Sequence, residues 1–190
     1  MRDKQSVLFI QGGGKGAHDE WDSKLVANLR HELGQRYEVH YPRMPHEDAP
    51  SFARWKPALR DLLETHGAGV VLVAHSVGGT MLLAALAEQS PRGLIGLFFV
   101  ATPFVGTGGW SAEGLELPAD LGARLPPSVP VHFFHGLADE TAPPAHVELY
   151  ARAIPQALIH RLRGRDHQLN GDLKEVAAAI RELGPRPAEI

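Results

Sequence analysis

Strand-length segments alternate with amphipathic segments along this chain. The strand-length segments occupy residues 6–11, 37–41, 69–75, 94–101, 131–135 and 157–162. Apolar residues at helical spacing lie between them, at residues 20–33, 52–66, 77–90, 145–153 and 173–183. Several of the strand-length segments are apolar throughout, which is typical of parallel strands buried on both faces. The alternation therefore predicts an α/β fold in which a doubly wound, mostly parallel sheet carries helices on both faces.

Residues 69–90 organise the chain, because a strand passes into a helix there through a single serine. Ala74, Gly78 and Gly79 surround Ser76 with small or absent side chains. A sharp turn of this kind holds one residue in strained backbone geometry and raises its hydroxyl at a helix N-terminus, which favours developing negative charge. The pattern predicts a nucleophile elbow at Ser76. The alternative is an ordinary strand-to-helix junction whose serine caps the helix.

Length and charge narrow the class of protein. At 190 residues and 44% hydrophobic content, the chain is long enough for one well-buried core, so we expect residues 1–190 to form a single domain. The net charge of -3 lacks the basic excess of a nucleic-acid-binding protein. The apolar runs fall well short of the ~20 residues of a membrane helix, and the N-terminus is unlike a signal peptide. We therefore expect a cytoplasmic protein with neither nucleic acid nor membrane as a partner.

A glycine-rich loop over residues 11–16 follows the first predicted strand. The spacing of Gly12, Gly14 and Ala17 fits a dinucleotide-binding fingerprint loosely. That motif also needs an acidic residue at the end of the next strand, and this strand ends in Tyr41 instead. The nucleotide interpretation is therefore weak. The alternative is that bare backbone N–H groups must approach a reacting oxygen, which glycine permits.

Residues 102–130 lose the periodicity of the rest of the chain. A loop of this length in a compact domain is usually functional or disordered. It follows the carboxyl end of a strand, where ligands bind in open α/β sheets, so we interpret it as a short lid. The lid would carry Phe104, Trp110, Leu115 and Leu117. The equally good alternative is that these apolar side chains close an edge of the core.

Two more residues complete a nucleophilic constellation with Ser76. A serine hydroxyl needs a base within hydrogen-bond reach and a group that orients the base. Asp139 and His167 each follow a predicted strand, so both are expected at the same edge of the sheet as Ser76. The chain order Ser, Asp, His is that of the α/β-hydrolase triad.

Other conspicuous residues have structural explanations. The 11 histidines form no metal-ligand spacing, so no metal site is expected. We expect His75 to point away from Ser76 into the packing, and Trp21 to pack the first helix against the sheet. The last helix is expected to stop at Gly184, with a frayed tail over residues 186–190.

These motifs together resemble the α/β-hydrolase superfamily over nearly the whole chain. They comprise residues 74–79 around the serine, residues 136–139 at the aspartate, and His167. Within the superfamily, the chain resembles the small serine hydrolases related to the retinoblastoma-binding serine hydrolase. That closer resemblance is carried by residues 41–45, by Trp55 and by the small size of the chain. It implies a compact α/β-hydrolase fold with a short lid.

The sequence departs from the family pattern at three positions. Ala74 replaces the first glycine of the motif G-x-S-x-G, which a small side chain should tolerate. Gln11 replaces the histidine that is common before the first-loop glycine, which leaves the oxyanion donor open. Asp166 stands where glycine is common, so Asp166 or Glu140 could replace Asp139 as the acid that orients the histidine.

The resemblance implies acyl transfer without a metal or other cofactor. Ser76 would attack a carbonyl carbon, His167 would act as the base, and Asp139 would orient it. The implied oxyanion donors are the backbone N–H groups of Val77 and Gly13. The expected substrate contacts are Gly12, Gly14, Phe104 and Trp110.

The sequence thus predicts a carboxylesterase-like serine hydrolase that cleaves a carboxylic ester, or a related acyl bond, of a small substrate through an acyl-enzyme. Amide and thioester hydrolysis use the same residues, and the sequence does not separate them from ester hydrolysis. The alternative is a hydrolase-fold protein with a mainly protein-interaction role, because fold does not imply function. A nucleotide-binding oxidoreductase is a more distant third interpretation.

Overall fold

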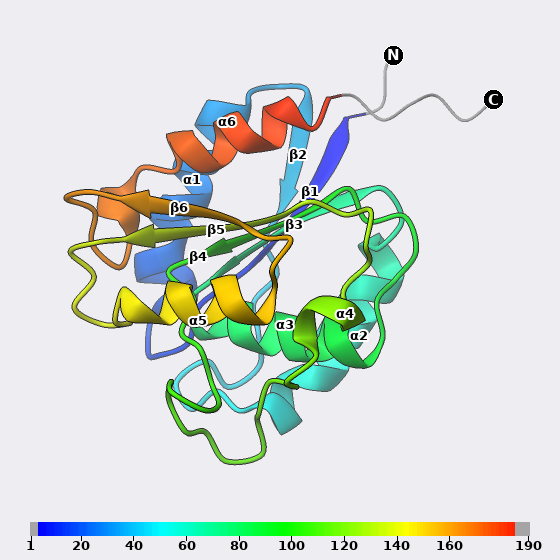
Figure 1. The fold of residues 1–190 in the computed structure, drawn as a ribbon. Coiled ribbons are helices and arrows are strands. Elements are labelled where there is room, and N and C mark those ends of the chain that lie inside the picture. The colour runs from blue at the N-terminus through cyan, green and yellow to red at the C-terminus, as the bar shows by residue number, and fades with distance from the viewer. Residues whose placement is uncertain (1–3, 185–190) are drawn as a thin grey trace.

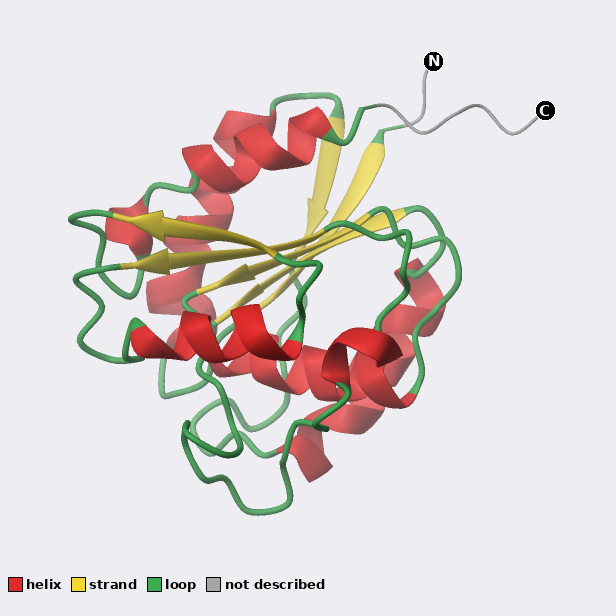
Figure 2. Cartoon of the chain, viewed as in Figure 1, coloured by secondary structure: helices red, strands yellow, loops and turns green. Residues whose placement is uncertain are grey.

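One parallel sheet forms the centre of the molecule (Figures 1 and 2). The structure is a computed structural model that describes residues 4–184, so the predicted frayed tail at residues 186–190 lies outside the described residues. Within the described range, six parallel strands lie in the order β2-β1-β3-β4-β5-β6. They are β1 (Gln5–Ile10), β2 (Tyr37–His40), β3 (Val70–His75), β4 (Gly96–Val100), β5 (Val131–Gly136) and β6 (Leu158–Leu162). The predicted parallel α/β sheet is confirmed.

Helices cover both faces of this sheet (Figure 1). One face carries α1 (Ser23–Leu33) and α6 (Lys174–Glu182), which contact each other. The other face carries α2 (Phe52–His66), α3 (Val77–Glu88), α4 (Leu121–Arg124) and α5 (Ala145–Ala153). A π-helical turn, η1 (Ala17–Asp22), precedes α1, and a 3₁₀ turn, η2 (Leu169–Gly171), precedes α6. No helix in the described part of the chain is long and apolar enough to cross a membrane.

Alternating side chains of the central strands build a core on each face of the sheet. Leu8 and Ile10 of β1 belong to the core under α2 and α3, whereas Val7 and Phe9 belong to the core under α1 and α6. Every residue of β3 is buried, as expected for a strand that is covered on both faces. Each continuously apolar strand therefore contributes side chains to both cores.

The strand order brings the glycine-rich loop beside the serine turn. β3 pairs with β1 on one side and with β4 on the other, so that Ile10 lies opposite Ala74 and His75 lies opposite Val100. The connections that follow β1 and β3 therefore leave the sheet next to each other at its carboxyl edge, where ligands bind in parallel sheets. β5 and β6 end at the same edge.

Residues 102–130 are only partly a surface segment. Leu115 and Leu117 are buried and belong to the core under α2 and α3. Leu115 lines a surface hollow together with Ala84 and Ala87 of α3, whose short side chains leave room for it. Of the two interpretations of these leucines, the structure supports the one in which they close an edge of the core, because both side chains are buried in it.

The N-terminal helix also differs from the prediction. Trp21 is 52% exposed, so the expectation that it packs the first helix against the sheet is wrong. It lies in η1, where backbone hydrogen bonds skip one residue more than in an α-helix. The 3.6-residue spacing of side chains in an α-helix does not hold there. Its ring instead lies 5.8 Å from the amine of Lys24, at the surface.

Candidate active site

Ser76 occupies the sharp turn between β3 and α3 with a backbone conformation that non-glycine residues rarely adopt. Its φ is 52° and its ψ is -135°. The strained residue is held from both sides, because its N–H donates to the carbonyl of Val100 at 2.9 Å and its carbonyl accepts from Gly79 at 2.9 Å. Ser76 is 9% exposed, so the surroundings fix the position of the hydroxyl.

The two glycines after Ser76 are required by close packing. A Cβ atom at Gly78 would collide with the carbonyl oxygen of Gln11, and one at Gly79 would collide with the hydroxyl of Thr102. The start of α3 therefore packs directly against the first loop and against the segment that follows β4.

Ser76, His167 and Asp139 lie in a hydrogen-bonded row. The His167 Nε2 atom lies 3.0 Å from the Ser76 Oγ atom, and His167 Nδ1 lies 2.8 Å from Asp139 Oδ2. Because a carboxylate only accepts, Nδ1 carries the proton in the neutral ring, and Nε2 is left to accept the serine O–H. This arrangement allows the imidazole to take a proton from the hydroxyl.

The Asp139 carboxylate is buried and fully engaged. Its Oδ1 accepts the backbone N–H groups of Thr141 and Ala142 at 2.9 Å each, and its Oδ2 lies 3.2 Å from His135 Nε2. Burial raises the pKa of this carboxyl, but the hydrogen bonds from His135 and His167 outweigh burial and hold the pKa well below its usual range. Asp139 is therefore ionised at neutral pH.

Neither alternative acid contacts the imidazole in this arrangement. Asp166 accepts the backbone N–H groups of Gln168 and Asn170 at 2.9 and 2.7 Å, which closes the turn after β6. Glu140 is exposed. The carboxylate beside His167 is that of Asp139.

The first loop presents one backbone N–H group beside the serine turn. Gly12 and Gly14 donate their N–H groups to Asp22 Oδ2 and to the carbonyl of Glu47, at 2.6 Å each. Between them, the N–H of Gly13 has no acceptor within residues 4–184. A Cβ atom at Gly13 would lie 2.8 Å from Val77 Cγ2, so Gly13 lies against the first residue of α3. The Val77 N–H belongs to the first turn of that helix, which lacks intrahelical acceptors.

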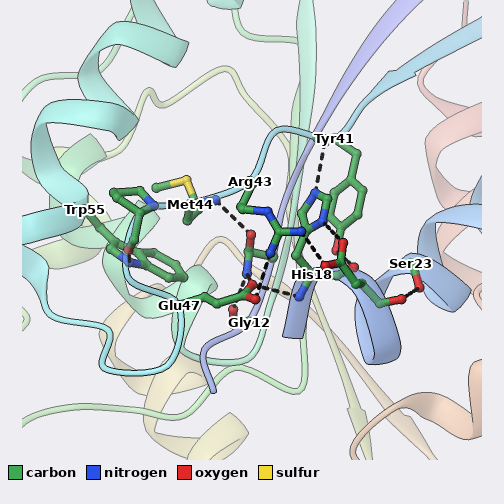
Figure 3. A network of polar contacts seen from close by, with 11 residues as sticks. Gly12, His18, Ser23, Tyr41, Arg43, Met44, Glu47 and Trp55 are labelled. Carbon is green, nitrogen blue, oxygen red and sulfur yellow. Dashed lines mark hydrogen bonds and ion pairs between the residues drawn. The ribbon is translucent and has the colours of Figure 1, made fainter. Parts of the chain in front are cut away.

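Gln11 anchors this loop in place of the histidine expected from the family. Its side chain is fully buried, with Oε1 accepting the N–H of Met44 at 2.8 Å and Nε2 donating to Glu47 Oε2 at 2.7 Å (Figure 3). The same Glu47 oxygen accepts the N–H of His18 at 3.0 Å. Gln11 and Glu47 therefore tie the glycine loop to the segment after β2, and no motif in the sequence identifies Glu47.

A model of one protein family matches nearly the whole chain. The model of the alpha/beta hydrolase family matches residues 7–187. The chain belongs to the alpha/beta hydrolase family. The comparison with curated proteins finds no match.

Solved structures of similar fold include several hydrolases. The ydeN gene product of B. subtilis is 19% identical with a TM-score of 0.70, over 95% of this chain and 98% of that one. The esterase domain of a Rhodothermus marinus protein is 18% identical with a TM-score of 0.66, and the match covers 96% of this chain and 90% of that domain's chain. Est1E from Butyrivibrio proteoclasticus is 15% identical with a TM-score of 0.69, and the match covers 96% of this chain and 87% of Est1E. At these identities the likeness shows that this alpha/beta hydrolase shares their fold.

The two aromatic residues predicted to contact substrate rest on α5 of this hydrolase. The N–H of Phe104 donates to His146 Nδ1 at 3.0 Å, and the Trp110 ring stands edge-on to the His146 ring at 5.5 Å. Burial lowers the pKa of His146, which keeps its Nδ1 free to accept. Phe104 also packs on Tyr150. Trp110 is 37% exposed and is the more open of the two side chains.

A second histidine–carboxylate pair lies beside the row. His75 is buried as predicted, but its ring makes polar contacts instead of apolar packing. Its Nδ1 lies 2.9 Å from Asp22 Oδ1, and its Nε2 lies 3.1 Å from the backbone oxygen of His167. Sequence reasoning missed Asp22, because a lone aspartate near a helix start is common.

Within residues 4–184, no three His, Asp or Glu side chains are grouped closely enough to hold a metal ion.

Proposed function

We propose that this alpha/beta hydrolase is a carboxylesterase-like serine hydrolase that cleaves a carboxylic ester of a small substrate through an acyl-enzyme. The observation that supports this most strongly is the row from Ser76 Oγ through His167 to Asp139, with distances of 3.0 and 2.8 Å. A hydroxyl, an imidazole and an ionised carboxylate in this order are the parts that acyl transfer needs.

The first half of the proposed reaction acylates the serine. His167 Nε2 takes the hydroxyl proton as Ser76 Oγ bonds to the ester carbonyl carbon, and Asp139 stabilises the imidazolium that forms. The backbone N–H groups of Val77 and Gly13 face the developing oxyanion, and each such donor typically contributes about 3 kcal/mol. His167 then gives the proton to the alcohol oxygen as the carbon–oxygen bond of the ester breaks.

The second half releases the acid. The same imidazole takes a proton from water, whose oxygen bonds to the acyl carbon. The tetrahedral intermediate collapses, the bond to Ser76 Oγ breaks, and the proton returns to the serine. The route uses side chains and backbone groups of this chain and needs no cofactor.

The proposed substrate is small because little of the chain is left to enclose it. Leu115 and Leu117 are buried in the core, which leaves Phe104 and Trp110 as the apolar side chains of that segment for substrate contact. Gly12 and Gly14 use their N–H groups within the protein, so in this proposal they contact substrate only through their bare Cα atoms. A long acyl chain would stay largely in water.

The closer relationship to small serine hydrolases belongs to the same proposal. It is supported by the segment after β2, where the indole N–H of Trp55 donates to the carbonyl of Pro45 at 2.8 Å (Figure 3). The bond joins Trp55 to residues 41–45, and these are the two parts of the chain on which the closer resemblance rests.

Ester turnover tests the proposal. Wild type and Ser76→Ala are compared on a series of p-nitrophenyl esters of increasing acyl length, and each protein is also treated with a fluorophosphonate probe. We expect turnover that falls with acyl length in the wild type, together with probe labelling, and loss of both in Ser76→Ala. Equal turnover by the two proteins would refute the nucleophile.

A further inference from the structure

The buried pair of Asp22 and His75 joins three segments of the proposed active site. Asp22 ends η1, and His75 is the last residue of β3, directly before Ser76. Asp22 Oδ2 accepts the N–H of Gly12 at 2.6 Å, while Asp22 Oδ1 lies 2.9 Å from His75 Nδ1. His75 Nε2 reaches the backbone oxygen of His167 at 3.1 Å. One pair therefore links the first loop, the serine turn and the histidine loop.

The contacts of His75 determine how its ring is protonated. Nε2 faces a backbone carbonyl oxygen, which only accepts, so Nε2 carries a proton. An unprotonated Nδ1 would set its partial negative charge 2.9 Å from the Asp22 Oδ1 atom, which is repulsive even though the ring is not aligned for a hydrogen bond at Nδ1. A second proton on Nδ1 converts this repulsion into an ion pair. Both side chains are 2% exposed, so the pair is shielded from water and salt.

The surroundings of His75 agree with a charged ring. The titratable groups that face it are Asp22 from η1, Asp139 from the loop after β5, and His167. Burial lowers the pKa of His75, but the two carboxylates outweigh burial and raise it. The net charge of the buried Asp22–His75 pair is then zero.

The space around the pair is too tight for it to move freely. A Cβ atom at Gly12 would lie 3.1 Å from His75 Nδ1, 3.2 Å from Ser76 Cβ and 3.5 Å from Asp22 Oδ2. The first loop, the serine and the pair are therefore in mutual contact. A displacement of one shifts the others.

We propose that Asp22 and His75 are positioning residues, a buried carboxylate–imidazolium pair that holds the Gly12–Gly13 loop and the backbone of His167 in register with Ser76. The inference rests on the proposed function. Neither side chain touches substrate in this account, so removing the pair lowers kcat while leaving KM nearly unchanged.

Two substitutions at Asp22 separate contacts from charge. Asp22→Ala leaves the N–H of Gly12 and the ring of His75 without a partner, and we expect kcat to fall roughly 10- to 100-fold with KM within about twofold, because small displacements are costly in catalysis. Asp22→Asn keeps the acceptor for the Gly12 N–H and sets an uncharged amide beside a neutral His75 ring. We expect its kcat within about fivefold of wild type.

The matched control is a partly buried histidine pair remote from the site. His132 Nδ1 lies 3.0 Å from His160 Nε2, near the amino end of β5. His132→Asn should lower the melting temperature while leaving kcat unchanged. Unchanged kcat in Asp22→Ala, equal losses in Asp22→Ala and Asp22→Asn, or the same loss in His132→Asn would each overturn the positioning role.

Nitrogen-15 NMR of the imidazole rings tests the pair without relying on turnover. The His75 signals are assigned by their absence in His75→Gln. At about pH 7.5, where an ordinary histidine is neutral, we expect both ring nitrogens of His75 to be protonated in wild type and only one in Asp22→Asn. One ring proton in wild type overturns the ion pair. If Ser76→Ala keeps full activity, the proposed function fails, and the proton count of His75 still decides whether the pair exists.

Discussion

Asp139 holds His167 through one particular oxygen. Its Oδ2 accepts from His167 Nδ1 at 2.8 Å, while its Oδ1 accepts the backbone N–H groups of Thr141 and Ala142 at 2.9 Å each. The two backbone bonds fix the rotation of the carboxyl group, so the atom that faces the imidazole is set by the turn after β5 and not by the imidazole itself.

This relationship predicts the effect of Asp139→Asn. The amide oxygen takes the Oδ1 position, because two N–H groups point at it, and the amide nitrogen then donates to His167 Nδ1. The imidazole is forced into the tautomer with its proton on Nε2, which cannot accept from Ser76. We expect kcat on a p-nitrophenyl ester to fall by about 10⁴-fold.

Glu140→Gln is the control for that measurement. Glu140 is exposed and adjacent in the chain, so its substitution should leave kcat unchanged. A comparable loss in both variants would show that the turn, and not the carboxylate, is what the reaction needs.

The depressed pKa of Asp139 predicts how stability depends on pH. The folded pKa lies below that of the unfolded chain, about 3.9, so the folded state binds fewer protons and this carboxylate stabilises the fold above that pH. Its contribution is lost as the pH falls through the unfolded value toward the folded one. The difference between wild type and Asp139→Asn in the free energy of unfolding in urea should therefore begin to narrow as the pH falls from about 6 to 3. A constant gap would contradict the account.

Gly13→Ala tests the first-loop oxyanion donor. A Cβ atom at this position would collide with the ring of Pro50 and lie 2.8 Å from Val77 Cγ2, so the loop must move. We expect kcat to fall roughly 10²- to 10³-fold, the loss typical of one missing oxyanion donor. Gly34→Ala at the end of α1 is the control: it strains the backbone at a positive φ of 72° without a collision, and it should affect stability alone. Wild-type kcat in Gly13→Ala would remove this donor from the mechanism.

Gln11→Leu tests the anchor of the glycine loop. The substitution leaves the buried N–H of Met44 without its acceptor and takes a hydrogen-bond donor from Glu47. Leaving a buried polar group unsatisfied costs roughly 1–3 kcal/mol, so the free energy of unfolding in urea should fall by about that amount. Gln11→Glu is the conservative comparison, because it keeps an acceptor for the Met44 N–H but sets its own carboxylate against that of Glu47. An unchanged unfolding free energy in Gln11→Leu would show that the hydrogen bonds of this side chain contribute nothing net.

The fold was predictable because the signals for it are local. Apolar runs such as that in β3 identify buried strands, and Gly78 and Gly79 mark a turn that no larger side chains would fit. Strand-to-helix alternation then limits the topology to a parallel sheet, whose carboxyl edge gathers residues distant in sequence.

The sequence is less informative outside regular, periodic segments. Trp21 is expected against the sheet, but it lies in a π-helical turn and is 52% exposed. Leu115 and Leu117 lie outside any long periodic segment, so the sequence leaves open whether they belong to a lid or to the core, where the structure buries them. Asp22 and His75 are 53 positions apart in the sequence (75 minus 22), and their pairing depends on the completed β1–β3 register.

The most direct test of the central claim is to trap the acyl group on the protein. The wild type is mixed with p-nitrophenyl acetate, quenched in acid during turnover, digested and examined by mass spectrometry. The account predicts one acetyl group on the peptide that contains Ser76, absent from Ser76→Ala and accumulating less in Asp139→Asn. Steady ester turnover with no acetyl group on Ser76, or turnover that survives in Ser76→Ala, would contradict it.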